Sequence, residues 1–291
     1  MSKQKYFIKS KYKKIQKWII GAYEPKGFSR QMAQDIFHEL ETVFMKEQLN
    51  EYTIEKSKYK SFEKELNFGQ FYNKDIWTRY ERKIAEYYIV YERLGIEYID
   101  GLKDFIYIDG AASSSPWSAW LRENRGIKAY SLDLLPPQEG MDKRFYIQSD
   151  ITKMPFKDAS IDAISLQSAL ETFPGDVDMN FIKECGRVLK SGGKCIITPL
   201  YMNREYVNAF GVSYFKNAGV EFDANKYYRC DFDMPFTRLY DVKHLKERIC
   251  DTAVSNGLKF QIFKLKNTDI ILIDNEYPYI YLNYFIEFCK N

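Results

Sequence analysis

The sequence has 291 residues and is 45% hydrophobic, enough for one well-packed core with or without a small helical appendage. A net charge of +3 is too small to indicate nucleic acid binding by itself, and no apolar run approaches the ~20 residues that stable membrane insertion needs. The five cysteines form no CxxC pair, so we expect no metal site, and an odd number without a signal peptide is typical of reduced thiols in the cytoplasm.

Residues 1–100 predict helices, because apolar residues recur there at helical spacing in three stretches. These stretches are Ile8, Tyr12, Ile15 and Ile19; Met32, Ile36, Leu40 and Val43; and Ile76, Tyr80, Ile84, Tyr87, Tyr91 and Leu94. Residues 1–23 contain several lysines and no acidic residue, which fits a solvated helix face or docking to an acidic partner or membrane surface. We expect residues 1–100 to form a helical extension on an α/β domain at 101–291.

From about residue 104 the pattern changes to short apolar strands that alternate with helices. We expect strands at 105–109, 127–133, 145–148, 161–167 and 194–201, and helices at 116–125 and 178–189. Ser115 and Pro116 suit the start of the first helix, and Gly192 suits the end of the second. This alternation predicts a doubly wound, mainly parallel sheet.

The chain after residue 201 has a less regular pattern. Residues 202–237 are rich in Tyr and Phe and predict no regular structure; because a loop of this length is usually functional, we expect a substrate lid there. A helix at 241–256 and strands at 258–265 and 270–273 should follow. The aromatic tail at 277–289 is ambiguous.

The segment around Asp109 and Gly110 is the most informative part of the sequence. An apolar strand ends there, a loop of small residues follows, and a helix then begins, which is the arrangement that cradles a nucleotide-like ligand. Small side chains let the backbone approach such a ligand closely. Of the three glycines in a G-x-G-x-x-G loop, the first is present, and Ala112 and Ser115 occupy the other two positions.

Further polar residues close the next three strands. Asp133 ends the second strand, Asp150 follows the third, and Gln167 ends the fourth. The carboxyl ends of parallel strands share one edge of the sheet, where ligands bind. An acidic residue about 20 positions beyond the loop is placed to accept hydrogen bonds from ribose hydroxyls. Together these positions predict a nucleotide-like cofactor at that edge.

Four segments in order resemble class I S-adenosylmethionine-dependent methyltransferases of the type 11 group. They are 108–114 (IDGAASS), 131–133 (SLD), 150–156 (DITKMPF) with 160–164 (SIDAI), and 187–197 (RVLKSGGKCII). The resemblance implies a seven-stranded, Rossmann-like methyltransferase sheet with S-adenosylmethionine as the cofactor. It assigns these residues to the cofactor site: Asp109; Gly110 and Ala111 at the methionine end; Asp133 at the ribose; Asp150 and the Ile151 amide at the adenine; and Gln167 near the sulfonium.

The methyl acceptor is less well defined by the sequence. A hydroxyl acceptor benefits from a general base, and our candidates are Glu171 first and His244 second. Tyr201 and Arg238 are candidate substrate-binding residues, Arg238 for a phosphate or carboxylate group. The segments 199–201 (PLY) and 238–241 (RLYD) more loosely resemble methyltransferases encoded among bacterial surface-glycan enzymes. We therefore expect O-methylation of a polar small molecule or glycan in carbohydrate biosynthesis.

Two other functions stay open at this point. A NAD(P)-dependent nucleotide-sugar oxidoreductase or epimerase uses a similar sheet, but its pyrophosphate needs glycines where Ala112 and Ser115 stand. A non-catalytic module could bind a partner through the basic N-terminal helices, although it would not need Asp133, Asp150 and Gln167 together. We expect a cytoplasmic enzyme with no nucleic acid partner and no stable membrane insertion, and the sequence leaves formation of a homo-oligomer open.

Overall fold

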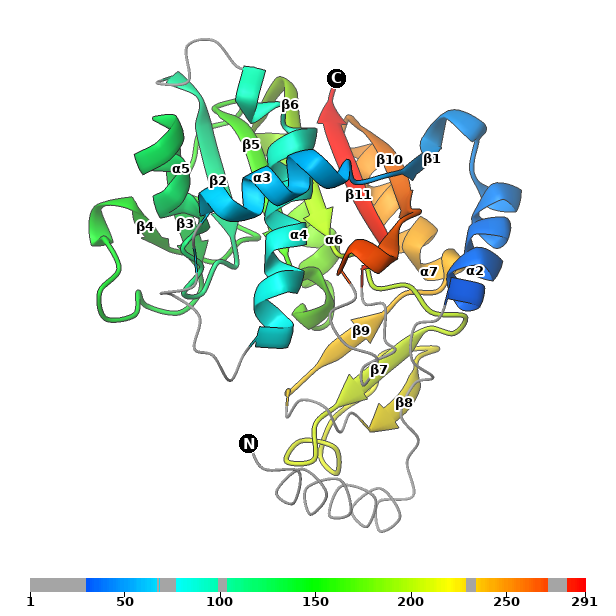
Figure 1. Ribbon diagram of the computed structural model, residues 1–291. Coiled ribbons are helices and arrows are strands. Elements are labelled where there is room, and N and C mark those ends of the chain that lie inside the picture. Colours follow the sequence, from blue (N-terminus) through cyan, green and yellow to red (C-terminus); the bar gives the residue numbers. More distant parts are fainter. Residues whose placement is uncertain (1–29, 67, 69–76, 99–103, 229–233, 272–281) are drawn as a thin grey trace, which may run out of the picture.

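The computed structural model describes residues 30–66, 68, 77–98, 104–228, 234–271 and 282–291 (Figure 1). Its centre is an eight-stranded sheet with the strand order β1-β10-β11-β6-β5-β2-β3-β4. The strands are β1 (Leu49–Tyr52), β2 (Ile106–Gly110), β3 (Lys128–Asp133), β4 (Tyr146–Gln148), β5 (Ile161–Gln167), β6 (Leu189–Thr198), β10 (Leu258–Leu265) and β11 (Tyr284–Lys290). Only β11 runs antiparallel to its neighbours, β10 and β6, so the sheet is mainly parallel.

Helices cover both faces of this sheet (Figure 1). One face is packed by α2 (Arg30–Val43), α6 (Val177–Val188), α7 (Val242–His244) and α8 (Asp251–Ser255), with a π-helical turn at Leu245–Cys250 between the last two. The other face is packed by α3 (Lys56–Leu66), α4 (Trp77–Arg93) and α5 (Trp117–Arg125). Short 3-10 helices lie at Lys46–Gln48, Ile96–Tyr98, Lys143–Phe145, Leu170–Thr172 and Thr268–Ile271.

The central strands are buried on both sides, which explains their nearly continuous apolar sequences. In β2, Tyr107 belongs to the cluster under α4 and α5, whereas the next residue, Ile108, belongs to the cluster under α6. Ala163 and Ile164 divide in the same way in β5. Because successive side chains of a strand point to opposite faces, a strand covered on both faces needs apolar residues at nearly every position.

Stacked aromatic rings hold α4 against α5. The fully buried Trp117 stacks on Tyr87 of α4 with ring centroids 4.9 Å apart, and on Trp120 at 5.3 Å. Two helix ends fit their local sequence: α5 stops at Gly126, which has a left-handed φ of 65°, and the Asp241 carboxylate caps α7. Local sequence and tertiary packing therefore agree in this region.

Most of the predicted elements are confirmed. The strands expected at 105–109, 127–133, 145–148, 161–167 and 258–265 and the helices at 116–125 and 178–189 are all present within one residue at each end. The strand expected at 270–273 is wrong where the structure describes it, because Thr268–Ile271 is a 3-10 helix. The antiparallel strand β11 comes instead from the ambiguous aromatic tail.

The N-terminal region contributes more than helices. β1 pairs in parallel with β10 and becomes the eighth strand of the sheet, which the helical pattern did not predict. The sequence of β1, LNEY, shows no strand pattern, because an edge strand that is only partly buried needs few apolar residues. On α2, Met32, Ile36 and Leu40 are buried as expected, but Val43 is exposed. The apolar face expected at residues 8–19 lies outside the described residues.

The segment 202–237, which we expect to form a lid and call the lid together with the rest of β9, forms most of a small separate sheet. Its strands β7 (Val207–Phe210), β8 (Asn225–Tyr228) and β9 (Thr237–Leu239) are arranged in the order β8-β7-β9. The expectation of irregular structure is therefore wrong, because strands of three or four residues are too short to show a periodic pattern. Figure 1 shows this sheet projecting from one end of the central sheet.

Two features are absent from the part of the chain that the structure describes. No helix among the described residues is both long and apolar enough to cross a membrane. The same residues contain no group of three or more His, Cys, Asp or Glu side chains arranged to hold a metal ion.

Gly110 lies where two side chains approach the backbone closely. A Cβ atom at this position would lie 2.7 Å from Ile151 Cδ1 and 2.9 Å from Leu166 Cδ2. We therefore expect Gly110→Ala to lower the free energy of unfolding by about 1–3 kcal/mol, the usual effect of overpacking a core. Urea denaturation measures this, with Gly219→Ala as the control because no atom lies within 4 Å of its added Cβ. Equal stability of the two variants would contradict the prediction.

Candidate functional site

Strand pairing brings several predicted residues to one edge of the sheet. Gly110 of β2 lies beside Leu132 of β3 and Leu166 of β5. Asp133 and Gln167 are the next residues of those two strands, so they lie one step further toward the carboxyl edge. The three strand ends therefore meet at one place, as the sequence predicts.

Asp133 organises the loop that follows β2. Its Oδ2 accepts the Ser113 amide at 2.8 Å, and its Oδ1 accepts the Leu135 amide at 2.9 Å. Ala111 and Ser113 have φ values of 49° and 48°, a left-handed conformation that non-glycine residues adopt at a cost. The hydrogen bond from Ser113 to the carboxylate helps to hold the loop in this conformation. Asp133 thus has a structural role in addition to its predicted contact with the ribose.

Asp150 and Ile151 lie next to the same edge. The Ser149 amide donates to the carbonyl of Asp133 at 2.9 Å, which fixes the segment after β4 beside β3. Asp150 is exposed, and its Oδ1 accepts the backbone amide and the hydroxyl of Thr152, which lower the pKa of the carboxyl group. Ile151 is buried directly against Gly110. The structure therefore brings these residues together with the loop after β2.

Two buried polar groups at this edge have no hydrogen-bond partner among the described residues. They are both carboxylate oxygens of Asp109 and the amide nitrogen of Gln167. Asp109 is completely buried, and this burial raises its pKa to about 7, although the Ser115 side chain and the charge of Lys83 act in the opposite direction. Such groups are costly in a protein interior unless they are paired, so a ligand that donates hydrogen bonds to Asp109 would be favoured here.

Three residues of α4 also reach this edge, and the sequence analysis missed them. Lys83 Nζ donates to the carbonyl of Gln167 and to Glu86 Oε2, both at 2.8 Å. The Ser168 hydroxyl donates to Glu86 Oε1 at 2.8 Å. Tyr87 follows Glu86 directly on the same helix. The one available signal was the presence of charged residues next to the apolar face of α4. Because α4 lies 20 or more residues before the loop that follows β2, no local sequence motif connects the helix to that loop.

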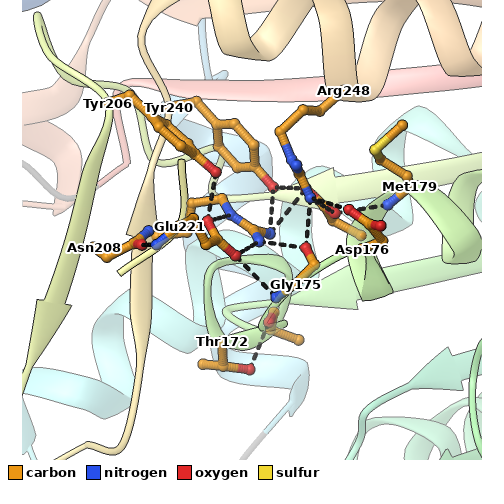
Figure 2. A network of polar contacts seen from close by, with 12 residues as sticks. Thr172, Gly175, Asp176, Met179, Tyr206, Asn208, Glu221, Tyr240 and Arg248 are labelled. Carbon is orange, nitrogen blue, oxygen red and sulfur yellow. Dashed lines mark hydrogen bonds and ion pairs between the residues drawn. The ribbon is translucent and has the colours of Figure 1, made fainter. Parts of the chain in front are cut away.

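A second group of residues lies at the lid, where Figure 2 shows Glu221, Tyr240 and Arg248 in one network of polar contacts. Arg238 is completely buried in β9, and it pairs with Asp178 (Nη1 to Oδ2, 2.8 Å) and with both carboxylate oxygens of Glu221. It also donates to the carbonyl of Gly175 at 2.7 Å and to the Tyr240 hydroxyl at 3.3 Å. The network thereby joins the lid sheet to the segment that precedes α6.

Arg248 provides a second cation for the same carboxylate. It donates to the two oxygens of Asp178 at 3.0 and 2.7 Å. Burial by itself would lower the pKa of Arg238, but the neighbouring Tyr240, Glu221 and Asp178 outweigh that effect and raise it. The buried charges are therefore balanced within the protein.

These contacts bear on the expectation that Arg238 holds an anionic substrate. All three of its guanidinium nitrogens are bonded to protein groups, and its side chain is not exposed. The contact with a substrate stays a prediction, whereas the observed contacts connect β9 to Gly175 and Asp178. The sequence could not show this, because Asp178, Glu221 and Arg238 are far apart along the chain.

The two candidate bases lie beside the lid. Glu171 is buried in the 3-10 helix Leu170–Thr172, a few residues beyond β5. His244 ends α7, with Nδ1 2.7 Å from Asp241 Oδ1, and its ring stacks on Tyr206 at a centroid distance of 3.8 Å. Among the contacts of the described residues, none joins His244 directly to the end of β2 or β5.

Tyr201 lies where the lid leaves the central sheet. It is half-buried and packs against both the small apolar core of the lid and the cluster under α4. Its carbonyl accepts the Tyr240 amide at 2.9 Å. Its proposed contact with a substrate stays a prediction.

Comparison with known proteins identifies the class of this domain. Residues 110–197 match the family model described as a methyltransferase domain. No curated protein sequence matches the chain. Similar solved structures include 1,6-didemethyltoxoflavin-N1-methyltransferase from Burkholderia thailandensis, with 13% identity over 82% of this chain and 91% of that one and a TM-score of 0.47. An S-adenosylmethionine-dependent methyltransferase from Mesorhizobium loti has 11% identity over 69% and 97%, with a TM-score of 0.43.

The match covers the strands and loops that contain Gly110, Asp133, Asp150 and Gln167. The strands from β10 to β4, with β11 antiparallel, form the Rossmann-like methyltransferase sheet that the sequence resemblance implies, and β1 extends it. Residues 110–197 therefore form a methyltransferase domain, for which S-adenosylmethionine is the expected cofactor. Nothing in the match or the described structure favours the oxidoreductase or the non-catalytic module.

Arg238→Met should lower the free energy of unfolding by about 3–5 kcal/mol, because Asp178 and Glu221 would keep buried negative charge without full compensation. Urea denaturation measures the change. Arg204→Met is the matched control: Arg204 forms an exposed ion pair with Asp35, and such pairs contribute about 0–1 kcal/mol. Adding Glu221→Gln to Arg238→Met should restore part of the lost stability, and a fully additive double variant would contradict the assigned pairing.

The raised pKa of Asp109 predicts a dependence of stability on pH. An unfolded Asp titrates near ~4, whereas the folded pKa is about 7. Between these values the folded state retains a proton that the unfolded state has released, so stability falls as the pH rises. The stability of the wild type relative to Asp109→Asn should therefore decline by on the order of 1 kcal/mol per pH unit from about pH 4.5 to 7 and then level off. Urea denaturation at several pH values would refute this if the difference were constant.

Proposed function

We propose that this methyltransferase transfers a methyl group to a hydroxyl of a neutral, polar small molecule or glycan. The sheet edge supports the binding of S-adenosylmethionine most directly. A loop of small residues meets Asp133 there, beside the Asp109 carboxylate and the Gln167 amide nitrogen, whose hydrogen-bonding atoms have no partner among the described residues. When bound, S-adenosylmethionine supplies an electrophilic methyl group on a sulfonium, so the protein mainly has to align the acceptor with it.

The residues at the edge fit the parts of this cofactor. Gly110 and Ala111 would line the methionine end, where the buried Asp109 carboxylate can accept hydrogen bonds from the ammonium group. Asp133 would accept from the ribose hydroxyls. Both described hydrogen bonds of the Asp150 carboxylate use Oδ1, so Oδ2 can accept from the adenine amino group, with the Ile151 amide beside the ring.

The acceptor would bind between Gln167, Tyr201 and the lid. The charge of Arg238 is neutralised by Asp178 and Glu221 inside the protein. A negative group on the acceptor is therefore not needed to balance it. A sugar hydroxyl is the first candidate, since Tyr and Phe rings of the lid can pack on its apolar face. A role in carbohydrate biosynthesis and a cytoplasmic location belong to the same proposal.

Glu171 is our first candidate for the general base, because it lies on the segment that directly follows β5. His244 is the second. With Nδ1 hydrogen-bonded to Asp241, Nε2 of its imidazole is left as the proton acceptor, and the carboxylate orients the ring. A pH profile of turnover with Glu171→Gln and His244→Gln would separate them, since the variant that lacks the base loses the fall in turnover at low pH that protonation of the base causes.

Calorimetric titration with S-adenosylhomocysteine, followed by a screen of hydroxyl acceptors with methyl-labelled cofactor, tests the proposed reaction. Binding of S-adenosylhomocysteine together with label transfer to a neutral hydroxyl compound is the expected result. Transfer only to amines or to phosphorylated compounds would overturn the acceptor assignment.

Asp150→Asn should weaken S-adenosylhomocysteine binding by about tenfold and leave the melting temperature almost unchanged. The asparagine retains an oxygen for Thr152, but it replaces the free acceptor with an NH₂ group that cannot accept from the adenine amino group. Calorimetry and thermal unfolding measure the two quantities. Asp158→Asn is the control, because this carboxylate is exposed and pairs with Arg187. If Asp150→Asn binds as tightly as the control does, the adenine assignment is wrong.

A further inference from the structure

We propose that Lys83 on α4 binds the carboxylate of the cofactor's amino acid end, while Asp109 binds its ammonium group. This inference rests on the proposed function. It assigns a cofactor-binding residue to the N-terminal region, outside the matched segment 110–197.

The position of α4 supports the assignment. Lys83 Nζ donates to the carbonyl of Gln167, the last residue of β5. One helical turn later, the Tyr87 hydroxyl lies 3.2 Å from Ser115 Oγ, at the end of the loop that follows β2. Residues four apart lie on one face of a helix. This face of α4 therefore contacts both the end of β5 and the loop that follows β2, next to Asp109.

The charges at this edge make a cation necessary. The charges of Asp133 and Glu86 both act on Asp109, and Asp109 and Asp133 stand at the predicted methionine and ribose positions. An amino acid carboxylate that enters such a site would be repelled unless a cation is near. Lys83 is the cation that acts on Asp109, where its charge favours the ionised carboxylate.

Lys83 also has the chemistry that the role requires. Its ammonium group has three N–H donors, and two of them are directed to Gln167 and Glu86. The side chain is 26% exposed, whereas that of Glu86 is 1% exposed and is also bonded to Ser168. Glu86 therefore fixes Lys83 at the edge, and the third N–H is left for a ligand.

The test compares two ligands that differ only in the amino acid end. S-adenosylhomocysteine has that end, and 5′-methylthioadenosine keeps the adenosine and the thioether but lacks it. Calorimetry with Lys83→Met should show a Kd for S-adenosylhomocysteine raised at least about tenfold, the effect of losing one charge-assisted hydrogen bond. The Kd for 5′-methylthioadenosine should change by less than about threefold, because that ligand makes no contact with Lys83.

Control variants separate the loss of the cation from damage to the fold. Lys83→Met leaves Glu86 buried without its partner, so the double variant Lys83→Met with Glu86→Gln removes both charges and should show the same selective loss. Lys83→Arg keeps a cation and should retain most of the preference for S-adenosylhomocysteine. Lys60→Met removes an equivalent lysine from an i,i+3 pair with Glu63 on α3 and should change neither affinity.

The binding results separate this proposal from the proposed function. Selective loss of S-adenosylhomocysteine binding in the single or the double variant supports it. An equal loss for both ligands, or unchanged binding of S-adenosylhomocysteine in a folded variant, overturns it. A wild-type protein that binds neither ligand would instead refute the proposed function, so the two failures are distinguishable.

Discussion

The burial of β2 on both faces and both sides is the constraint on which this site depends. Helices cover its two faces, and β3 and β5 pair with its two edges. In such a sheet ligands bind beyond the carboxyl ends of the strands, and Asp109 and Gly110 are the residues at that end of β2. The close packing of Ile151 against Gly110 fixes the position of the segment after β4 relative to the end of β2. The positions of the predicted cofactor residues follow from this packing.

The lid depends on a different kind of interaction. Arg238, Asp178 and Glu221 form a buried ionic cluster, and a buried ion pair contributes little stability relative to apolar residues of the same size. Its geometry is specific, however, because each charge must meet its partner. The cluster fixes the lid sheet to the segment around Gly175, which connects Glu171 to α6. Charge pairing thus acts together with apolar packing, since Met202, Tyr206 and Tyr240 belong to the buried cluster under α6.

The N-terminal region and the methyltransferase domain share one structure. β1 extends the sheet, α2 packs on the face of α6, and α4 lies over the ends of β5 and β2. The aromatic stack of Tyr87 on Trp117 ties α4 to α5 and so to the cofactor loop. If Lys83 binds the cofactor, this region contributes directly to the affinity for it, and ligand binding would stabilise the packing of α4 on the sheet.

The sequence by itself determined the alternation of strands and helices between residues 104 and about 200, because strands buried on both faces require continuous apolar runs that are visible without a structure. It also placed Asp109, Asp133 and Gln167 at strand ends, since parallel strands share one ligand edge. Tertiary structure decided the rest. Strand β1 and the lid strands are short and partly polar, so no periodic signal marks them. The roles of Arg238 and Lys83 depend on partners 17 to 84 residues away, Glu221 for the first and Gln167 for the second. Such pairings arise only when the chain folds, because the energy of a charge depends on its burial and neighbours, which local sequence does not specify.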